Sequence, residues 1–267
     1  MLNNVIYIGG VARSGTSWVG QLINSCPSVR FRFQPLFAYE FKNTLSEESS
    51  LKDIENFYND LYNSSSEFLN QSDKVKAGIY PDFSKENETT LAFKENRYQS
   101  FIEPMLRKHK ETKFVGVIRN PNATLYSWTQ NEKEFPKDAD ILKEWRFGNC
   151  KNQGNEDYFG YYKWKEVANL YLDLKDKFPD RVYIFHYDKF LDNVFDNVKE
   201  LYRFLNLDFT IQTQNFIQKA SSNNQDSYYS VYKGSKNKDL WKDEFPKYIT
   251  DEINADLSKT RLETFLY

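Results

Sequence analysis

The segment at residues 5–25 constrains the fold of this chain more than any other. Residues 5–8 (VIYI) predict a buried strand, because the run is short, apolar and rich in β-branched side chains. Two glycines follow, and from Thr16 onward apolar residues recur at helical spacing until Cys26-Pro27. A strand, a glycine-containing turn and a helix in this order are typical of an α/β protein.

Further segments repeat this alternation along the chain. We predict four more strands, at 29–33, 90–93, 113–118 and 181–185. Helical patterns cover about 47–63, 97–110, 121–134, 156–178, 191–205 and the stretch from Pro246 towards the end. The sequence therefore predicts a three-layer α/β fold, with a central parallel sheet of about five strands and helices on both faces. No linker of biased composition divides the chain, so we expect residues 1–267 to form a single domain. The polar stretch 220–238 lacks a helical period and predicts a long surface loop.

Composition excludes several classes of function. The chain has 36 Lys and Arg against 38 Asp and Glu, a net charge of −2, which argues against a dedicated nucleic-acid binder. Two cysteines and two histidines offer no metal-ligand spacing, so we expect reduced thiols and no metal. We find no apolar run long enough to cross a membrane and no signal peptide. A cytoplasmic location is the resulting expectation.

The turn after the first strand carries groups that bind an anion. Residues 9–18 have the sequence GGVARSGTSW, and backbone N–H groups at the start of a helix bind phosphate or sulfate. Gly10 and Gly15 have the spacing of a Walker A motif, but Thr16 stands where the lysine that grips a triphosphate belongs. The cation lies inside the loop instead, at Arg13. The alternative is an ordinary turn between a strand and a helix.

This loop resembles the 5′-phosphosulfate loop of the sulfotransferase family. Members of that family transfer a sulfuryl group from 3′-phosphoadenosine 5′-phosphosulfate (PAPS) to a hydroxyl or an amine, and release 3′-phosphoadenosine 5′-phosphate (PAP). The resemblance implies a P-loop NTPase-like sulfotransferase fold with PAPS as the co-substrate. It assigns donor binding to Arg13, Ser14, Gly15, Thr16, Ser17 and Trp18. Trp18 would stack on adenine, although a tryptophan in the helix core is the alternative.

A second motif of the same family follows the fourth predicted strand. Arg119 ends that strand and Ser127 stands eight positions later, which resembles the pair that binds the 3′-phosphate. The alternative is an arginine at a strand end and a buried helix serine. A late loop of the family resembles residues 232–234, where Tyr232 replaces the family's arginine. The resemblance implies that Lys233 and Gly234 close over the nucleotide.

The residue that would activate the acceptor departs from both common family patterns. Asn96 stands where one branch has histidine, and Gln34 stands where another has glutamate. Neither amide can accept a proton, so we predict Glu95 or Glu40 as the general base. A surface salt bridge for Glu95 and a solvated helix face for Glu40 are the alternatives. Lys94 is predicted to be a second cation for the sulfuryl oxygens.

Arg13 is predicted to stabilise the negative charge that develops on the leaving phosphate. Aromatic residues cluster at 33–41 and 158–164, and flat rings suit sugars or phenols, although core packing is the alternative. The loop with Arg13 and the segment 33–37 resemble carbohydrate sulfotransferases, so we expect a saccharide or another small molecule as the acceptor. Two other functions stay open. One is a P-loop nucleotide kinase or NTPase, and the other is an inactive nucleotide- or sugar-binding module.

Overall fold

The computed structural model describes residues 4–222, 231 and 239–267. Its strands form one parallel sheet of five, in the order β2-β3-β1-β4-β5. The strands are β1 (Asn4–Gly9), β2 (Val29–Phe33), β3 (Thr90–Glu95), β4 (Thr112–Ile118) and β5 (Val182–His186). All five predicted strands are confirmed, and so is the three-layer α/β fold.

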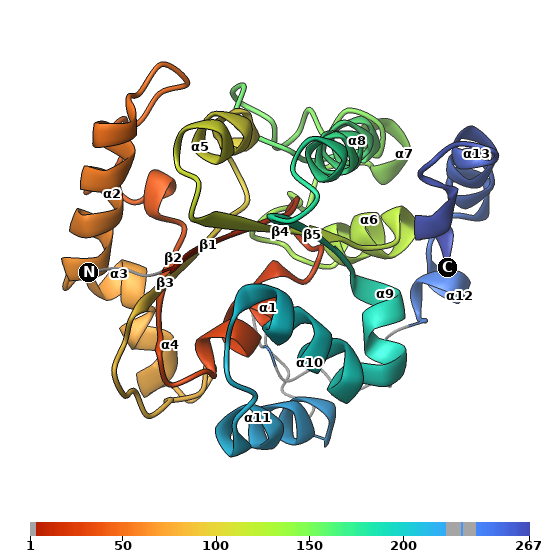
Figure 1. Cartoon of the computed structure of the whole chain (residues 1–267). Helices are drawn as coiled ribbons and strands as arrows, with labels where there is room; N and C mark the ends of the chain where they lie inside the picture. The colour runs from red at the N-terminus through yellow and green to blue at the C-terminus, as the bar shows by residue number, and fades with distance from the viewer. Residues whose placement is uncertain (1–3, 223–230, 232–238) are drawn as a thin grey trace.

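Helices cover both faces of the sheet (Figure 1). On one face lie α1 (Thr16–Asn24), α10 (Val194–Leu205) and α11 (Ile211–Ser222). On the other lie α2 (Leu51–Asn63), α5 (Ile102–Lys108) and α8 (Tyr161–Lys177). Strand side chains alternate between the two faces, so the sheet separates two hydrophobic cores. Within β1, Val5 and Tyr7 belong to the core under α2, α5 and α8, whereas Ile6 and Ile8 belong to the core under α1 and α10.

The other elements surround this framework. Two further helices of more than two turns are α6 (Pro121–Thr129) and α13 (Lys247–Leu257). The short helices are α3 (Glu67–Asn70), α4 (Ser72–Lys76), α7 (Ile141–Glu144), α9 (Tyr187–Phe190), α12 (Trp241–Glu244), and the 3₁₀ helices η1 (Pro35–Phe37), η2 (Gln99–Phe101), η3 (Leu191–Asn193) and η5 (Glu263–Leu266). Within the described ranges, every helix is too short or too polar to span a membrane.

Several helix bounds differ from the predicted ones for local reasons. The helix predicted at 47–63 begins at Leu51, because Ser50 and Asp53 form a capping box there. Gly160, with φ +88°, delays the start of α8 to Tyr161. The segment 121–134 is helical only as far as Thr129.

The prediction of a surface loop at 220–238 is wrong for its first residues. Helix α11, which the sequence analysis missed, continues through residues 220–222. The other residues of that loop, apart from Val231, lie outside the described residues.

The strand ends place the two predicted motifs at one edge of the sheet. In a parallel sheet all strands finish at the same edge, where ligands commonly bind. Gly9 at the end of β1 pairs with Glu95 of β3 on one side and with Gly116 of β4 on the other. The turns after β1 and β4, and the end of β3, are therefore neighbours in space.

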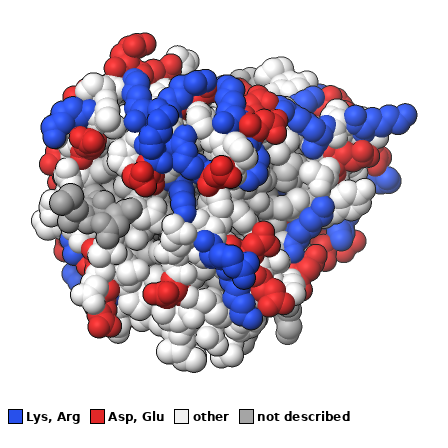
Figure 2. Space-filling model, in the orientation of Figure 1, with Lys and Arg blue, Asp and Glu red and all other residues white. Residues whose placement is uncertain are grey.

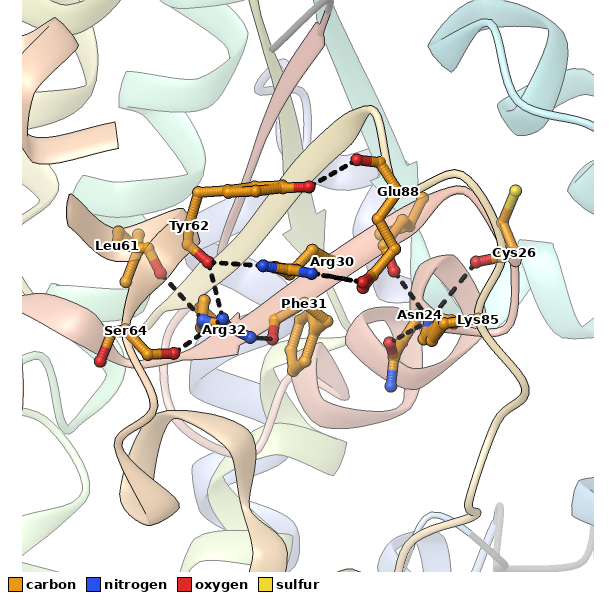
Figure 3. A network of polar contacts seen from close by, with 11 residues as sticks. Asn24, Cys26, Arg30, Phe31, Arg32, Leu61, Tyr62, Ser64, Lys85 and Glu88 are labelled. Carbon is orange, nitrogen blue, oxygen red and sulfur yellow. Dashed lines mark hydrogen bonds and ion pairs between the residues drawn. The ribbon is translucent and has the colours of Figure 1, made fainter. Parts of the chain in front are cut away.

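A network of arginine contacts fastens the edge strand β2 to helix α2 (Figure 3). Arg32 is only 7% exposed. Its Nε donates to the carbonyl oxygen of Leu61 at 2.9 Å, and its Nη2 donates to those of Tyr62 and Ser64 at 2.9 and 3.0 Å. The last carbonyls of a helix lack partners within the helix, so the guanidinium caps the end of α2.

We expect Arg32→Met to lower the free energy of unfolding by about 2–4 kcal/mol, because buried carbonyls would lose charged donors. Chemical denaturation would measure the change. Arg107→Met is the matched control, since Arg107 forms an exposed pair with Glu103 within one helix and such pairs contribute about 0–1 kcal/mol. Equal losses for the two variants would contradict a capping role for Arg32.

Basic and acidic side chains are interspersed on the face shown in Figure 2. A dense group of Lys and Arg lies over α5 in that view. Glu103 of α5 pairs with both Arg107 and Lys177, at 2.5 and 2.9 Å. Part of this basic surface is therefore neutralised within the protein.

Candidate active site

The turn between β1 and α1 winds tightly around the helix start. The hydroxyl of Ser14 donates to the carbonyl oxygen of Val11 at 2.7 Å, and Ser14 is fully buried. Arg13 and Gly15 both have left-handed backbones, with φ of +69° and +91°. Gly15 occupies the N-cap position of α1 without a capping side chain. The first N–H groups of α1 therefore have no side-chain cap among the described residues, which suits an anion.

Arg13 joins the two motifs that the sequence analysis singled out. Its Nε donates to the hydroxyl of Ser127 at 3.2 Å, although the two residues are 114 positions apart. In the opposite direction, Nη1 of Arg119 donates to the carbonyl oxygen of Arg13 at 3.1 Å. The structure thus brings Arg13, Arg119 and Ser127 into one site at the edge of the sheet.

Arg119 lies beside aromatic rings, and one of its donors is buried without a partner among the described residues. Its guanidinium lies 5.4 Å from the ring centre of Tyr187, and Trp164 donates its indole N–H to the carbonyl oxygen of Arg119 at 2.9 Å. Its Nε is buried and has no hydrogen-bond partner among the described residues. A buried charged donor without an acceptor is costly, so this atom fits a bound anion.

Two further residues of the loop have defined contacts. The hydroxyl of Thr16 donates to Oδ1 of Asn96 at 3.1 Å, so the end of β3 touches the anion loop. Trp18 packs edge-on against Phe185 and Phe190, with ring centres 6.4 and 6.2 Å away. Its ring is half-buried, and its stacking on adenine stays a prediction.

Lys94 is buried on the same side of the sheet as the loop. It is only 3% exposed, and its Nζ lies 4.5 Å from the ring centre of Phe33. Burial lowers the pKa of Lys94 below its ordinary value. The charge of Glu95 opposes this shift, and the nearby charges of Lys74 and Arg13 add to it.

Glu95 and Glu40, the two predicted bases, have very different surroundings. Glu95 is completely buried, and its carboxylate accepts backbone N–H bonds from Asn96 at 3.0 Å, Arg97 at 3.3 Å and Leu36 at 3.2 Å. Burial raises the pKa of Glu95 above its ordinary value, although Lys94 and these N–H donors oppose the shift. Glu40 is exposed and accepts a hydrogen bond from the hydroxyl of Ser64 at 3.1 Å. These contacts hold Glu95 between the end of β3 and η1, and they hold Glu40 beside Ser64, the residue that follows α2.

Glu134 is a site residue that the sequence analysis missed. Its Oε2 lies 3.9 Å from Nε of Arg13, and the two side chains are 18% and 13% exposed. Glu134 is the last residue of the helix predicted at 121–134, but α6 ends at Thr129 and the chain then turns back. This turn is held by Trp128, whose indole N–H donates to the carbonyl oxygen of Glu134 at 3.0 Å. No local motif marks such a position.

Other predicted residues are less closely tied to the site. Tyr158, Tyr161 and Trp164 are at most 8% exposed, so these members of the second aromatic cluster form part of the core, whereas Tyr162 is exposed. Lys233 and Gly234 lie outside the described residues. Across the described ranges, no three His, Cys, Asp or Glu side chains gather as metal ligands would.

The comparisons with known proteins agree with this architecture. The family model of the sulfotransferase domain matches residues 4–260, and the chain therefore belongs to the sulfotransferase family. A sequence search of curated proteins gave no significant match.

Three solved structures share the fold at low identity. Mouse sulfotransferase SULT7A1 complexed with PAP has a TM-score of 0.59 at 13% identity, over 99% of this chain and 87% of that one. Retinol dehydratase in a complex with retinol and PAP has a TM-score of 0.55 at 14% identity, over 98% and 83%. The sulfotransferase domain of a Synechococcus PCC 7002 olefin synthase has a TM-score of 0.55 at 15% identity, over 99% and 95%.

Proposed function

We propose that this protein transfers the sulfuryl group of PAPS to a hydroxyl or amine of an acceptor. One observation carries the proposal: Arg13, Arg119 and Ser127 meet beside the uncapped start of α1, and the Nε of Arg119 is buried without a partner. Membership of the sulfotransferase family supports it. So does the presence of PAP in two proteins of the same fold.

The proposal assigns each part of the donor to one segment. Residues 13–18 hold the 5′-phosphosulfate through the N–H groups of the loop and the first turn of α1. Arg119 and Ser127 hold the 3′-phosphate, with Arg119 supplying charged donors and Ser127 a neutral one. Trp18 stacks on the adenine, and Lys233 and Gly234 cover the nucleotide.

Sulfuryl transfer is an in-line displacement at sulfur, and the protein contributes position and charge. Arg13 stabilises the negative charge on the oxygen that bridges phosphate and sulfate. Because an arginine stays protonated, it acts through charge and hydrogen bonds and not as an acid. Lys94 is the second cation and faces the sulfuryl oxygens.

We further propose a saccharide as the acceptor. The ring of Phe33 lies beside the cations Lys94 and Lys74, with ring-centre distances of 4.5 and 4.8 Å. Phe37 on η1 is partly exposed, and Tyr39, which follows η1, is almost fully exposed. Flat aromatic faces of this kind pack against sugar rings.

Calorimetric titration with PAP, with and without Mg²⁺, tests the donor site, and ATP is the control ligand. We expect PAP to bind in the micromolar range, independently of Mg²⁺ and more tightly than ATP. A preference for Mg-ATP would favour the kinase or NTPase alternative. PAP binding without any cleavage of PAPS would favour the inactive binding module.

The variant Arg119→Ala should bind PAP about 10–150-fold more weakly, which is the loss of one charged hydrogen-bonding group, about 1.5–3 kcal/mol. The same titration measures it. Arg107→Ala is a suitable control, because Arg107 lies on the surface of α5 and pairs with Glu103. If PAP bound Arg119→Ala as tightly as the control, the assignment of the 3′-phosphate to Arg119 would be wrong.

A further inference from the structure

We propose that Glu134 is the general base that takes the proton from the acceptor hydroxyl. This inference rests on the proposed function, because it assigns a residue to the same reaction. Four observations carry it: the place of Glu134 beside Arg13, its relation to Lys94, an unpartnered carboxylate oxygen, and the contacts of the other candidate bases.

The first observation is the position of Glu134. Its Oε2 lies 3.9 Å from the Nε of Arg13, the cation that we assign to the bond that breaks. Both side chains are mostly buried, so the pair lies inside the site and not on the surface. A base must lie within hydrogen-bond reach of the attacking oxygen, which itself approaches the sulfur beside Arg13.

The second observation is the charge around the carboxylate. Lys94 interacts electrostatically with both Glu134 and Arg13. Glu134 therefore shares one cluster with the two cations that face the bridging and sulfuryl oxygens in the proposed site. Lys94 comes from the end of β3, Arg13 from the turn after β1 and Glu134 from the turn after α6, so three separate segments build this cluster.

The third observation is an acceptor atom without a donor. The Oε2 of Glu134 is buried and has no hydrogen-bond partner among the described residues. A buried carboxylate oxygen of this kind costs free energy unless a donor reaches it. The hydroxyl of an acceptor molecule is such a donor.

The fourth observation concerns the two bases predicted from the sequence and the two histidines. Glu95 is fully buried and already accepts three backbone N–H bonds. Glu40 is exposed and bonded to Ser64. His109 is bonded to the hydroxyl of Thr112 at 2.9 Å, and His186 lies 2.7 Å from the carbonyl oxygen of Thr264. Each of these groups is engaged by a neighbour, whereas Glu134 offers an open acceptor.

Oε2 of Glu134 accepts the proton of the acceptor hydroxyl while that oxygen forms its bond to sulfur. The bond between sulfur and the bridging oxygen breaks, and its electron pair stays on the 5′-phosphate of PAP beside Arg13. Glu134 returns its proton to water after the sulfated product has left.

The test compares Glu134→Gln with Glu132→Gln. Glutamine keeps the size of the side chain but cannot accept a proton. Glu132 is the matched control because it lies two positions away, is exposed and pairs with Lys137 at 3.1 Å. Cleavage of PAPS is followed with two nucleophiles, water and 4-nitrophenol at a pH where the phenol is ionised. Unfolding temperatures of both variants check that the fold is kept.

We expect Glu134→Gln to cleave PAPS with water about 10²–10⁴-fold more slowly, the usual contribution of a general base. With 4-nitrophenolate the loss should be below about tenfold, because the nucleophile carries no proton to remove. PAP should bind as tightly as to the wild type. Glu132→Gln should match the wild type in all three measurements.

Several results would overturn the assignment. Equal losses with both nucleophiles, or a large loss of PAP affinity, would mean that Glu134 only positions Arg13. An unchanged rate for Glu134→Gln would exclude it as the base and leave the proposed function intact. If the wild-type protein bound PAP but cleaved no PAPS, Glu134 could not be a general base. If it did not bind PAP, the proposed function itself would be wrong.

Discussion

Arg13→Ala should lower the rate of PAPS cleavage by about 10²–10³-fold, the usual loss when one donor to a developing negative charge is removed. The guanidinium lies within the anion loop, and its Nε already donates to Ser127 at 3.2 Å. Because charge on the bridging oxygen is largest in the transition state, the loss should appear in kcat more than in the affinity for PAP. Single-turnover cleavage of PAPS with 4-nitrophenolate measures it.

Arg13→Lys is the conservative control for this prediction. A lysine keeps the positive charge but cannot reach two acceptors with a planar fork, so it should recover part of the rate. A slow Arg13→Ala variant could reflect weaker donor binding or slower breaking of the bond, and its affinity for PAP should separate these two explanations. If Arg13→Ala lost rate and PAP affinity to the same extent, Arg13 would serve binding and not the breaking of the bond.

The parts of the fold that were predictable are those set by local sequence. The β-branched runs at residues 5–8 and 113–118 lie within buried strands, and Gly10 and Gly15 mark the turn before α1. The fixed spacing of Arg119 and Ser127 located the second motif because both residues belong to one strand-to-helix junction. Once the strands are parallel, their common edge brings the two junctions together.

The parts that were missed depend on contacts between distant segments. The third strand was predicted at 90–93, yet β3 continues through Lys94 and Glu95, and both charged residues are buried at its end. The N–H of Leu36, which follows a different strand, supplies one of the bonds that hold Glu95 there. Glu134 meets Arg13 only because the chain turns back after α6. A helical period within 121–134 gave no sign of that turn.

Gly15→Ala should disturb both motifs at once. Gly15 has φ +91°, a conformation that costs an L-residue roughly 1–2 kcal/mol. A Cβ at this position would lie 2.2 Å from the ring of Tyr187, and that ring also faces the guanidinium of Arg119. The loop or the tyrosine must therefore move, and crowding of this kind adds about 1–3 kcal/mol. We expect a loss of about 2–5 kcal/mol in the free energy of unfolding and at least about a tenfold loss of PAP affinity.

Two comparisons make this prediction specific to the anion loop. Gly154→Ala adds the same methyl group where no atom lies within 4 Å, so both the stability and the PAP affinity should stay at wild-type values. In a Tyr187→Ala background the crowding is removed, and Gly15→Ala should then cost only the backbone strain, because clash and strain are separate terms. If Gly15→Ala behaved like Gly154→Ala, the close packing of Tyr187 on the loop could not be what shapes the donor site. If Gly15→Ala costs less free energy of unfolding in the Tyr187→Ala background, the clash with Tyr187 accounts for the difference. The packing of Tyr187 would then hold the loop amides and Arg119 towards the same anion.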